Sequence, residues 1–200
     1  MYVIDKDEDL YDLTQKDAVY PQAFPVLLEY LKKRHTFDWE KRVHSILIDA
    51  VAVKEARGVA GKELVCQFRK EKDEGLRFEI GNALSVVATE EEVDDLTTLA
   101  LDGSYGGSRA MLCKALARVL GDDAVPILAK LLKSEDQAVV GMTIQALGDR
   151  RAVNTRESIE SFLNHKESWV RGEARKAIKK MDTHLKRIQK KLEKELKDQK

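Results

Sequence analysis

DEGLRFEIGNAL, residues 73–84, carries a spacing of residue types that returns along the chain. An acidic opener is followed four residues later by Arg77 and then, ten and eleven residues after the opener, by an Ala-Leu pair. Four other stretches align with it: EKRVHSILIDAV (40–51), YGGSRAMLCKAL (105–116), DQAVVGMTIQAL (136–147) and ESWVRGEARKAI (167–178). Self-similarity at a period of about 20 to 50 residues indicates a stacked-repeat architecture.

The period follows from the recurring alanines, which lie 33, 32, 31 and 31 residues apart at Ala50, Ala83, Ala115, Ala146 and Ala177. Apolar residues at helical spacing also precede each copy, and only three prolines and eleven glycines interrupt the chain. We therefore predict an all-α fold of five helical hairpins, over residues 18–53, 56–87, 90–120, 121–149 and 151–182. A lone hairpin cannot bury its apolar face, so stability must come from stacking on its neighbours.

Short signals mark the expected helix ends. Thr89 and Glu92 have the spacing of a capping box, in which each side chain bonds the other residue's backbone N–H. Gly121 and Gly148, each followed by Asp, are predicted to break the chain where one helix ends and another begins.

The domain organisation has three parts: an acidic N-terminal segment or cap (1–17), the repeat solenoid (18–182) and a Lys-rich C-terminal capping helix (183–200). In the last part Leu185, Ile188, Leu192 and Leu196 continue one apolar stripe at helical spacing. The stripe is predicted to cover the open end of the stack, and the alternative is that it pairs with another chain.

The charge of the chain is balanced overall, with 35 Lys and Arg against 35 Asp and Glu. It is unevenly placed, because residues 166–200 hold 13 Lys and Arg against 6 Asp and Glu. A uniformly basic footprint for nucleic acid is absent, so nucleic-acid binding is not expected. The N-terminus lacks the blocks of a secretory signal and no run is long enough to span a membrane, which predicts a cytoplasmic protein, expected to be a monomer.

The repeated stretches resemble the HEAT-repeat family, in particular the short bacterial HEAT-like repeats that also occur in phycobilin lyases. The resemblance covers about residues 18–182 and rests on the second-helix pattern Asp73, Arg77, Ala83, Leu84, which returns as Arg109, Ala115, Leu116 and as Arg171, Ala177, Ile178. His44 and Val140 replace the Arg in the first and fourth copies, and Tyr105 replaces the opener in the third. The resemblance implies a right-handed α-solenoid whose second helices line the concave side, but it implies no single activity.

The recurring arginines, Arg77, Arg109 and Arg171, have two possible roles. The resemblance implies that each pairs with the acidic opener of a neighbouring repeat and ties the units together. The alternative is a basic ladder for an anionic partner.

No catalytic or metal-binding constellation stands out. The four histidines, His35, His44, His165 and His184, are spread over different repeats, whereas a metal site or a catalytic pair needs converging ligands. Cys66 and Cys113 lie in amphipathic helical patterns and are expected to pack as free thiols. The chain is therefore predicted to be non-catalytic and to need no cofactor.

The candidate binding residues come from positions that should face away from the outer helices, one, two and five residues after the recurring Arg. They predict a shallow groove on the concave face, floored by Phe78, Met111 and Met142 and lined by Asn82, Lys114 and Gln145. Small residues cluster nearby, among them Gly106, Gly107, Gly141 and Gly172, which indicates a close approach either of a partner or of adjacent helices. The full predicted set is Phe78, Glu79, Asn82, Met111, Lys114, Met142, Gln145, Trp169 and Lys176.

These features together predict an adaptor or inhibitor-like module that binds a protein or peptide on its concave face. One alternative is a HEAT-like DNA glycosylase acting on alkylated bases, since SWVRGEARKAI (168–178) is faintly similar to a helix of such enzymes. Only two tryptophans, Trp39 and Trp169, are available to it, in different repeats. The other alternative is a tetrapyrrole lyase or chaperone-like protein.

Overall fold

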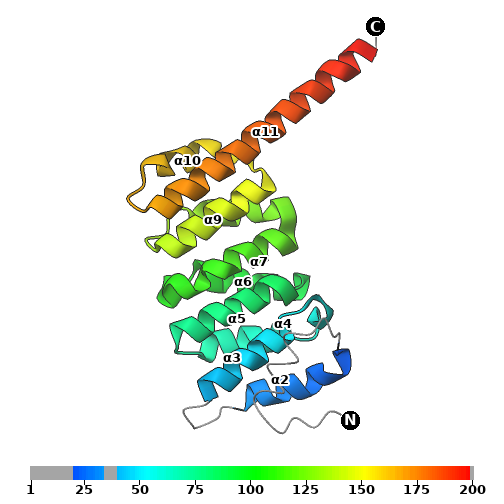
Figure 1. Ribbon diagram of the computed structural model, residues 1–200, viewed down its shortest axis with the longest axis vertical. Helices are drawn as coiled ribbons and strands as arrows, with labels where there is room; N and C mark the ends of the chain where they lie inside the picture. Colours follow the sequence, from blue (N-terminus) through cyan, green and yellow to red (C-terminus); the bar gives the residue numbers. More distant parts are fainter. Residues whose placement is uncertain (1–19, 34–39, 199–200) are drawn as a thin grey trace. The chain divides into compact units, whose positions relative to one another are not determined.

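The computed structural model describes residues 20–33 and 40–198, and every regular element within these ranges is helical (Figure 1). The chain divides into two compact units, residues 1–120 (unit 1) and residues 121–200 (unit 2). The predicted N-terminal segment, His35 and Trp39 lie outside the described residues.

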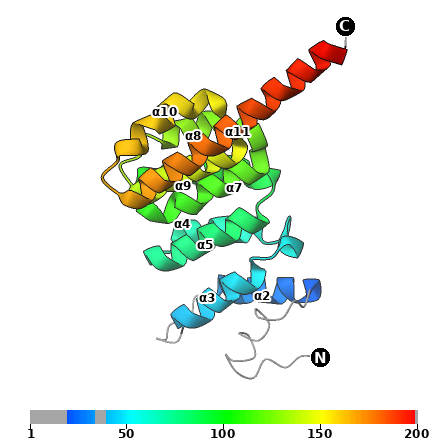
Figure 2. The ribbon, with the colours of Figure 1, turned by 45° about the horizontal axis from the view of Figure 1, so that its top comes forward.

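Unit 1 contains three helical hairpins in its described residues. The first helices of the pairs are α2 (Phe24–Lys32), α4 (Gly61–Lys70) and α6 (Val93–Leu101), and the second helices are α3 (Glu40–Val51), α5 (Glu74–Val87) and α7 (Ala110–Leu120). Each second helix packs on its own first helix, and α5 lies between α3 and α7 (Figure 2). The second helices thus form one layer and the first helices the other, as the repeat predicts.

Unit 2 contains the remaining two hairpins. The first pair is α8 (Val125–Leu131) with α9 (Gln137–Arg150), and the second is the short α10 (Arg156–Glu160) with α11 (Ser168–Asp198). The two second helices, α9 and α11, make the most extensive packing contact within the unit. Short 3-10 turns join the helices, including Gly121–Ala124 before α8 and Ser161–Asn164 before α11.

The recurring alanines hold the seams between neighbouring helices, because all five are buried: Ala50, Ala83, Ala115, Ala146 and Ala177. The leucines that follow them in three copies, Leu84, Leu116 and Leu147, are fully buried as well. A small residue beside a large one at each level lets two helices approach while the larger side chain fills the space between the layers. The apolar spacing that defined the repeat is therefore the core of each unit.

Polar contacts add ties between neighbouring repeats of unit 1. The Lys41 ammonium on α3 lies 2.7 Å from a carboxylate oxygen of Asp73 at the start of α5. The Arg118 guanidinium on α7 donates to the backbone carbonyls of Ser85 and Ala88, at 2.7 and 2.5 Å, and so caps the C-terminal end of α5. These bonds satisfy carbonyls that a helix end leaves without an intrahelical donor.

Of the two predicted chain breaks, the one at Gly121 is correct and the one at Gly148 is wrong. Gly121 has a positive φ of 61°, a conformation that favours glycine, and it separates α7 from the next turn. Gly148 was predicted to end a helix, but it lies inside α9, which continues to Arg150. A Cβ atom at Gly148 would lie 2.7 Å from the Ala177 Cα, so this glycine allows the α11 backbone to approach α9.

The C-terminal segment continues the last repeat without interruption, because α11 is one helix of 31 residues. Its final turns extend beyond α9 and α10 (Figure 1). The apolar stripe on these turns is exposed, with Leu185 at 41%, Ile188 at 42%, Leu192 at 53% and Leu196 at 63%. The stripe was predicted to cover the end of the stack, and the structure of unit 2 differs from that prediction because the helix runs past the elements it would cover.

Candidate protein-binding face

The second helices of unit 1 carry four of the predicted residues on their surface. Phe78 is 42% exposed on α5, an unusual position for a large aromatic side chain. Asn82 on α5 and Lys114 on α7 are also exposed, and Glu79 on α5 is half-buried. We call the surface formed by α3, α5 and α7 the inner-helix face of unit 1.

Met111 does not belong to that surface, although the sequence placed it on the floor of a groove. Its side chain is only 7% exposed. A Cβ atom at Gly81 would lie 3.4 Å from the Met111 Cβ, so Met111 packs between α7 and α5 where α5 has no side chain. Met111 is a core residue, and the predicted groove floor in unit 1 is reduced to Phe78.

The inner-helix face of unit 1 also holds two interacting carboxylates. Burial, and secondarily the Glu79 charge, raises the pKa of Asp49 on α3 above its ordinary value. One carboxylate oxygen of Glu79, Oε2, is buried without a hydrogen-bond partner. A buried carboxylate oxygen that lacks a donor raises the free energy of the folded state.

Trp169 is the main feature of the corresponding surface of unit 2, formed by α9 and α11, which we call the inner-helix face of unit 2. A Cβ atom at Gly141 would lie 1.9 Å from Cζ3 of the Trp169 ring, so the indole lies directly on the α9 backbone. The side chain is nevertheless 42% exposed. Gly141 therefore leaves the space that the indole occupies, and one side of the ring remains open to solvent.

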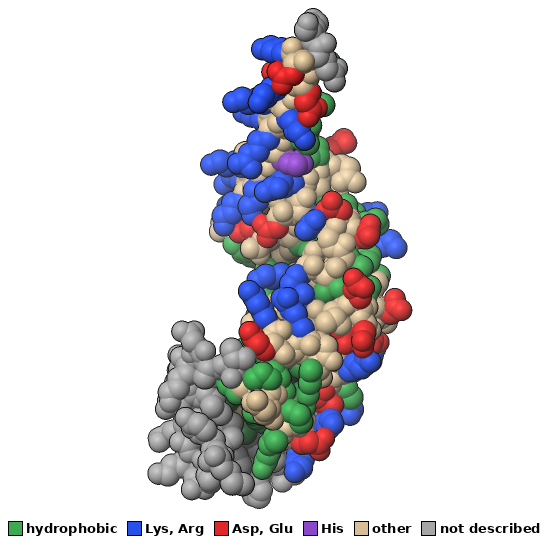
Figure 3. Space-filling view, turned by 90° about the vertical axis from the view of Figure 1, so that its right-hand side faces the viewer, with side chains coloured by type: hydrophobic (Ala, Val, Ile, Leu, Met, Phe, Trp, Pro, Cys, Tyr) green, Lys and Arg blue, Asp and Glu red, His purple; other side chains and the backbone are tan. Residues whose placement is uncertain are grey.

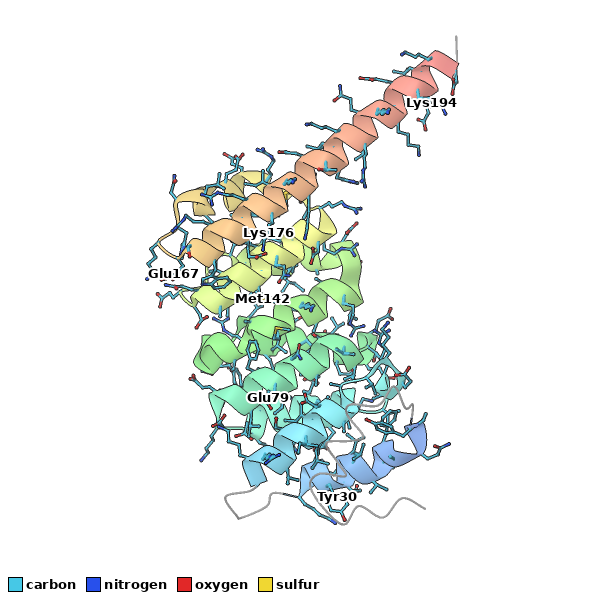
Figure 4. All side chains as sticks on the ribbon, in the orientation of Figure 1. Tyr30, Glu79, Met142, Glu167, Lys176 and Lys194 are labelled. Carbon is cyan, nitrogen blue, oxygen red and sulfur yellow. The ribbon has the colours of Figure 1, made fainter. Side chains whose placement is uncertain are left out.

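The other predicted residues of unit 2 lie on the same two helices. Met142 and Gln145 are half-buried on α9, and Lys176 is exposed on α11 with its ammonium 2.7 Å from Glu173. In Figure 4 the side chains of Met142 and Lys176 lie on the same side of unit 2. Gly172 has open space at its Cβ position, which leaves a gap in the row between Trp169 and Lys176.

The recurring arginines bond to the backbone of their own hairpins. Arg77 donates to the Glu71 carbonyl, Arg171 to the carbonyls of His165 and Lys166, and Arg109 to the carbonyls of Ala100 and Gly106. The hydrogen bonds of Arg77 and Arg171 differ from the expected pairing with an acidic opener, since each fastens the loop that precedes its own helix. Arg77 does contact the opener position of the next repeat, because its guanidinium lies 5.3 Å from the centre of the Tyr105 ring. The opener Asp73 itself links two repeats through Lys41.

Comparison with known proteins agrees with this architecture. Residues 106–179 match a family model described as HEAT repeats. This part of the chain contains HEAT repeats. Among solved structures, an engineered protein that was a structural genomics target superposes with a TM-score of 0.50 at 18% identity, covering 90% of this chain and 96% of that one. A second engineered protein has a TM-score of 0.49 at 17% identity, covering 88% and 90%. At such identities the likeness concerns the fold alone. No curated protein matches the chain.

The last HEAT repeat carries a cationic cluster that the sequence analysis did not single out. Arg151, at the C-terminal end of α9, and several residues of α11 line a shallow hollow: Lys176, Lys179, Lys180, Thr183, His184 and Arg187. Figure 3 shows Lys and Arg side chains gathered along one side of α11. The recurrence of Lys176, Lys180, His184 and Arg187 every three or four residues is the signal that could have revealed it.

Residues 20–33 and 40–198 contain no group of three or more His, Cys, Asp or Glu that could hold a metal ion. In the same ranges, none of the helices combines the length and apolar character needed to cross a membrane.

Proposed function

We propose that this HEAT-repeat chain is a non-catalytic protein-binding module, an adaptor or inhibitor-like subunit, that holds a partner polypeptide on its inner-helix faces. The observation that carries the proposal is Trp169, which is 42% exposed and rests on the backbone at Gly141. Tryptophan is enriched among the few residues that supply most of the binding energy of protein interfaces.

The packing of Trp169 supports a role in binding rather than in folding alone. A ring held against the α9 backbone has lost most of its rotational freedom before any partner arrives. Association then removes the open side of the ring from water with little further ordering cost. The open position at Gly172 leaves room beside the ring for a side chain of the partner.

The charges around Trp169 indicate what the partner segment should contain. Lys176 lies on the same helix as Trp169, and the cationic hollow begins at Lys176. Aromatic, apolar and acidic side chains would complement this combination. We therefore propose a polypeptide segment in which an apolar residue occupies the gap at Gly172 and acidic residues follow toward Lys180.

Affinity capture from cell extract, quantified by mass spectrometry, tests the proposal with a matched pair of variants. Trp169→Ala removes the anchor from the inner-helix face, and Tyr30→Ala removes a 48% exposed aromatic from the first helix α2. Captured proteins should be depleted at least about tenfold by Trp169→Ala and retained by Tyr30→Ala.

A third variant tests whether binding requires the indole of Trp169 to lie at its observed position on α9. Gly141→Ala keeps the indole but must displace it from α9. It should weaken capture of the same proteins as Trp169→Ala. Equal capture by wild type and Trp169→Ala, with both chains folded, would remove the inner-helix face of unit 2 from the proposal. Phe78→Ala applies the same test to unit 1.

A further inference from the structure

The final turns of α11 present an apolar stripe that is exposed among the described residues of the chain. Leu185, Ile188, Leu192 and Leu196 are between 41% and 63% exposed, whereas Met181, one turn earlier, is fully buried in unit 2. These four residues share one side of the helix because they recur every three or four positions. A contiguous row of exposed aliphatic side chains on a projecting helix is characteristic of an interaction surface.

We propose that residues 183–198 pair antiparallel with the same residues of a second copy of this chain. The proposal is independent of the function assigned to the inner-helix faces. The stripe is nearly symmetric about its centre, so that in an antiparallel pair Leu185 lies opposite Leu196 of the second copy. In the same register Ile188 lies opposite Leu192, and all four aliphatic positions find apolar partners.

The charged residues beside the stripe favour the second copy as partner. At 100° per residue, Lys186 and Glu193 lie on one side of the stripe, and His184, Lys191 and Glu195 lie on the other. Antiparallel pairing brings Lys186 to within about 3 Å, measured along the helix axis, of the level of the second copy's Glu193. It brings His184 equally close to the level of the second copy's Glu195. Both pairs occur twice because the arrangement is two-fold symmetric, whereas the two Lys191 residues approach each other once, near the centre.

The parallel arrangement is disfavoured by the same residues. In a parallel pair the two flanks meet at equal height, so Glu193 would face both Glu195 and Lys191 of the second copy, and Lys186 would face His184. Like charges opposite each other destabilise the pair. Glu195 lies 3.7 Å from Lys191 of its own helix, and both side chains are more than half exposed, so this contact is weak and leaves Glu195 free to exchange partners.

Sedimentation equilibrium of the full chain tests the proposal, from about 10 µM to about 500 µM because a contact of four residues per chain gives a modest affinity. The wild type should show a monomer–dimer equilibrium in that range. Lys186→Glu and Glu193→Lys should each raise the dissociation constant about tenfold, because each places like charges opposite at two sites. The double variant should return to within about threefold of the wild type, since it restores both opposite-charge pairs with the same composition.

Leu192→Glu should abolish the dimer throughout the range, because a charge then interrupts the apolar contact. Its far-ultraviolet circular dichroism should match the wild type, as Leu192 is 53% exposed and packs in no core. A wild type that stays monomeric at the highest concentration would overturn the proposal. A double variant that dimerises less well than both single variants would also overturn it. If the wild type stays monomeric and instead sediments with phosphatidylserine vesicles, the stripe binds a membrane surface and the proposal is wrong.

Discussion

Gly148 and Gly172 illustrate at the residue scale that one residue type can serve opposite purposes on neighbouring helices. Both lie inside long helices, where glycine costs up to about 1 kcal/mol relative to alanine. At Gly148 that cost is offset by the close contact of α9 with α11, since a Cβ atom would meet the Ala177 backbone at 2.7 Å. At Gly172 no atom beyond its chain neighbours and the backbone of its own helix lies within 4 Å of the Cβ position, so no packing among the described residues requires glycine there.

Alanine substitutions at these two positions should therefore move stability in opposite directions. Gly148→Ala should lower the free energy of unfolding by about 1 to 3 kcal/mol, the range for overpacking a close contact. Gly172→Ala should raise it by up to about 1 kcal/mol through helix propensity. Urea denaturation followed by circular dichroism measures both, as shifts in midpoint at constant slope. Destabilisation by Gly172→Ala would mean that the gap beside Trp169 is required for folding and is not reserved for a partner.

The exposure of a side chain could be predicted from the sequence where it depends on the residue's own helix. The prediction failed where the distance to a neighbouring helix decides the exposure. Phe78 and Met111 occupy related positions one and two residues after the recurring Arg, and both were expected at the surface. Phe78 is 42% exposed, but Met111 is buried because α5 presents Gly81 to it. Helical periodicity gives the direction of a side chain, and it does not give the distance to the next helix.

At the scale of elements, the start of α5 shows how one carboxylate serves two helices. Asp73 Oδ1 accepts from the Leu76 N–H at 2.9 Å and so caps α5, while Oδ2 accepts from Lys41 on α3 at 2.7 Å. The Lys41 hydrogen bond first, and the Leu76 N–H second, lower the pKa of Asp73 below its ordinary value of 3.8. The ionised carboxylate therefore stabilises the packing of α5 on α3.

The pH dependence of Asp73→Asn follows from that lowered pKa. Asparagine caps helices about as well as aspartate, so the substitution removes the charge and keeps the cap. The wild type should have the higher melting temperature near neutral pH. Its advantage should shrink as the pH falls from 3.8 through the lower folded-state pKa, where the native carboxylate takes up a proton. Lys41→Met should give the same profile, and a difference that stays constant through the acid range would contradict the assignment.

The elements themselves could be predicted because two periodicities coincide. The spacing of apolar residues within each stretch predicts helices, and the alanine series with its 31- to 33-residue period predicts their stacking. The partners of the recurring arginines could not be predicted, because a guanidinium donates to a backbone carbonyl as readily as to a carboxylate. Residue types show where the carboxylates are, but only the fold decides which backbone carbonyl comes within reach. The end of α9 was misplaced for a related reason, since Gly148 was interpreted as a chain break when it accommodates α11.

At the scale of the whole molecule, the distribution of charged residues determines whether the chain can bind an anionic partner such as nucleic acid. The chain carries 35 Lys and Arg against 35 Asp and Glu, and the excess of cations falls within residues 166–200. Several of those cations already have intramolecular partners: Lys176 pairs with Glu173, Lys180 with Asp149 and Lys191 with Glu195. A cation that is already paired contributes less to counterion release on binding a phosphate backbone.

Duplex DNA should therefore not be retained by the full chain at about 50 mM salt, as measured by fluorescence anisotropy of a labelled oligonucleotide. The combined variant Asp149→Asn with Glu173→Gln provides a matched comparison, because it frees Lys180 and Lys176 without adding a cation. Any retention should appear first in that variant and should fall steeply as salt is raised. Tight retention by the wild type, with a steep salt dependence, would assign the cationic hollow to nucleic acid and favour the base-excision alternative over a protein partner. Salt-independent retention would instead indicate contacts to the bases, for which Trp169 is the first side chain to substitute.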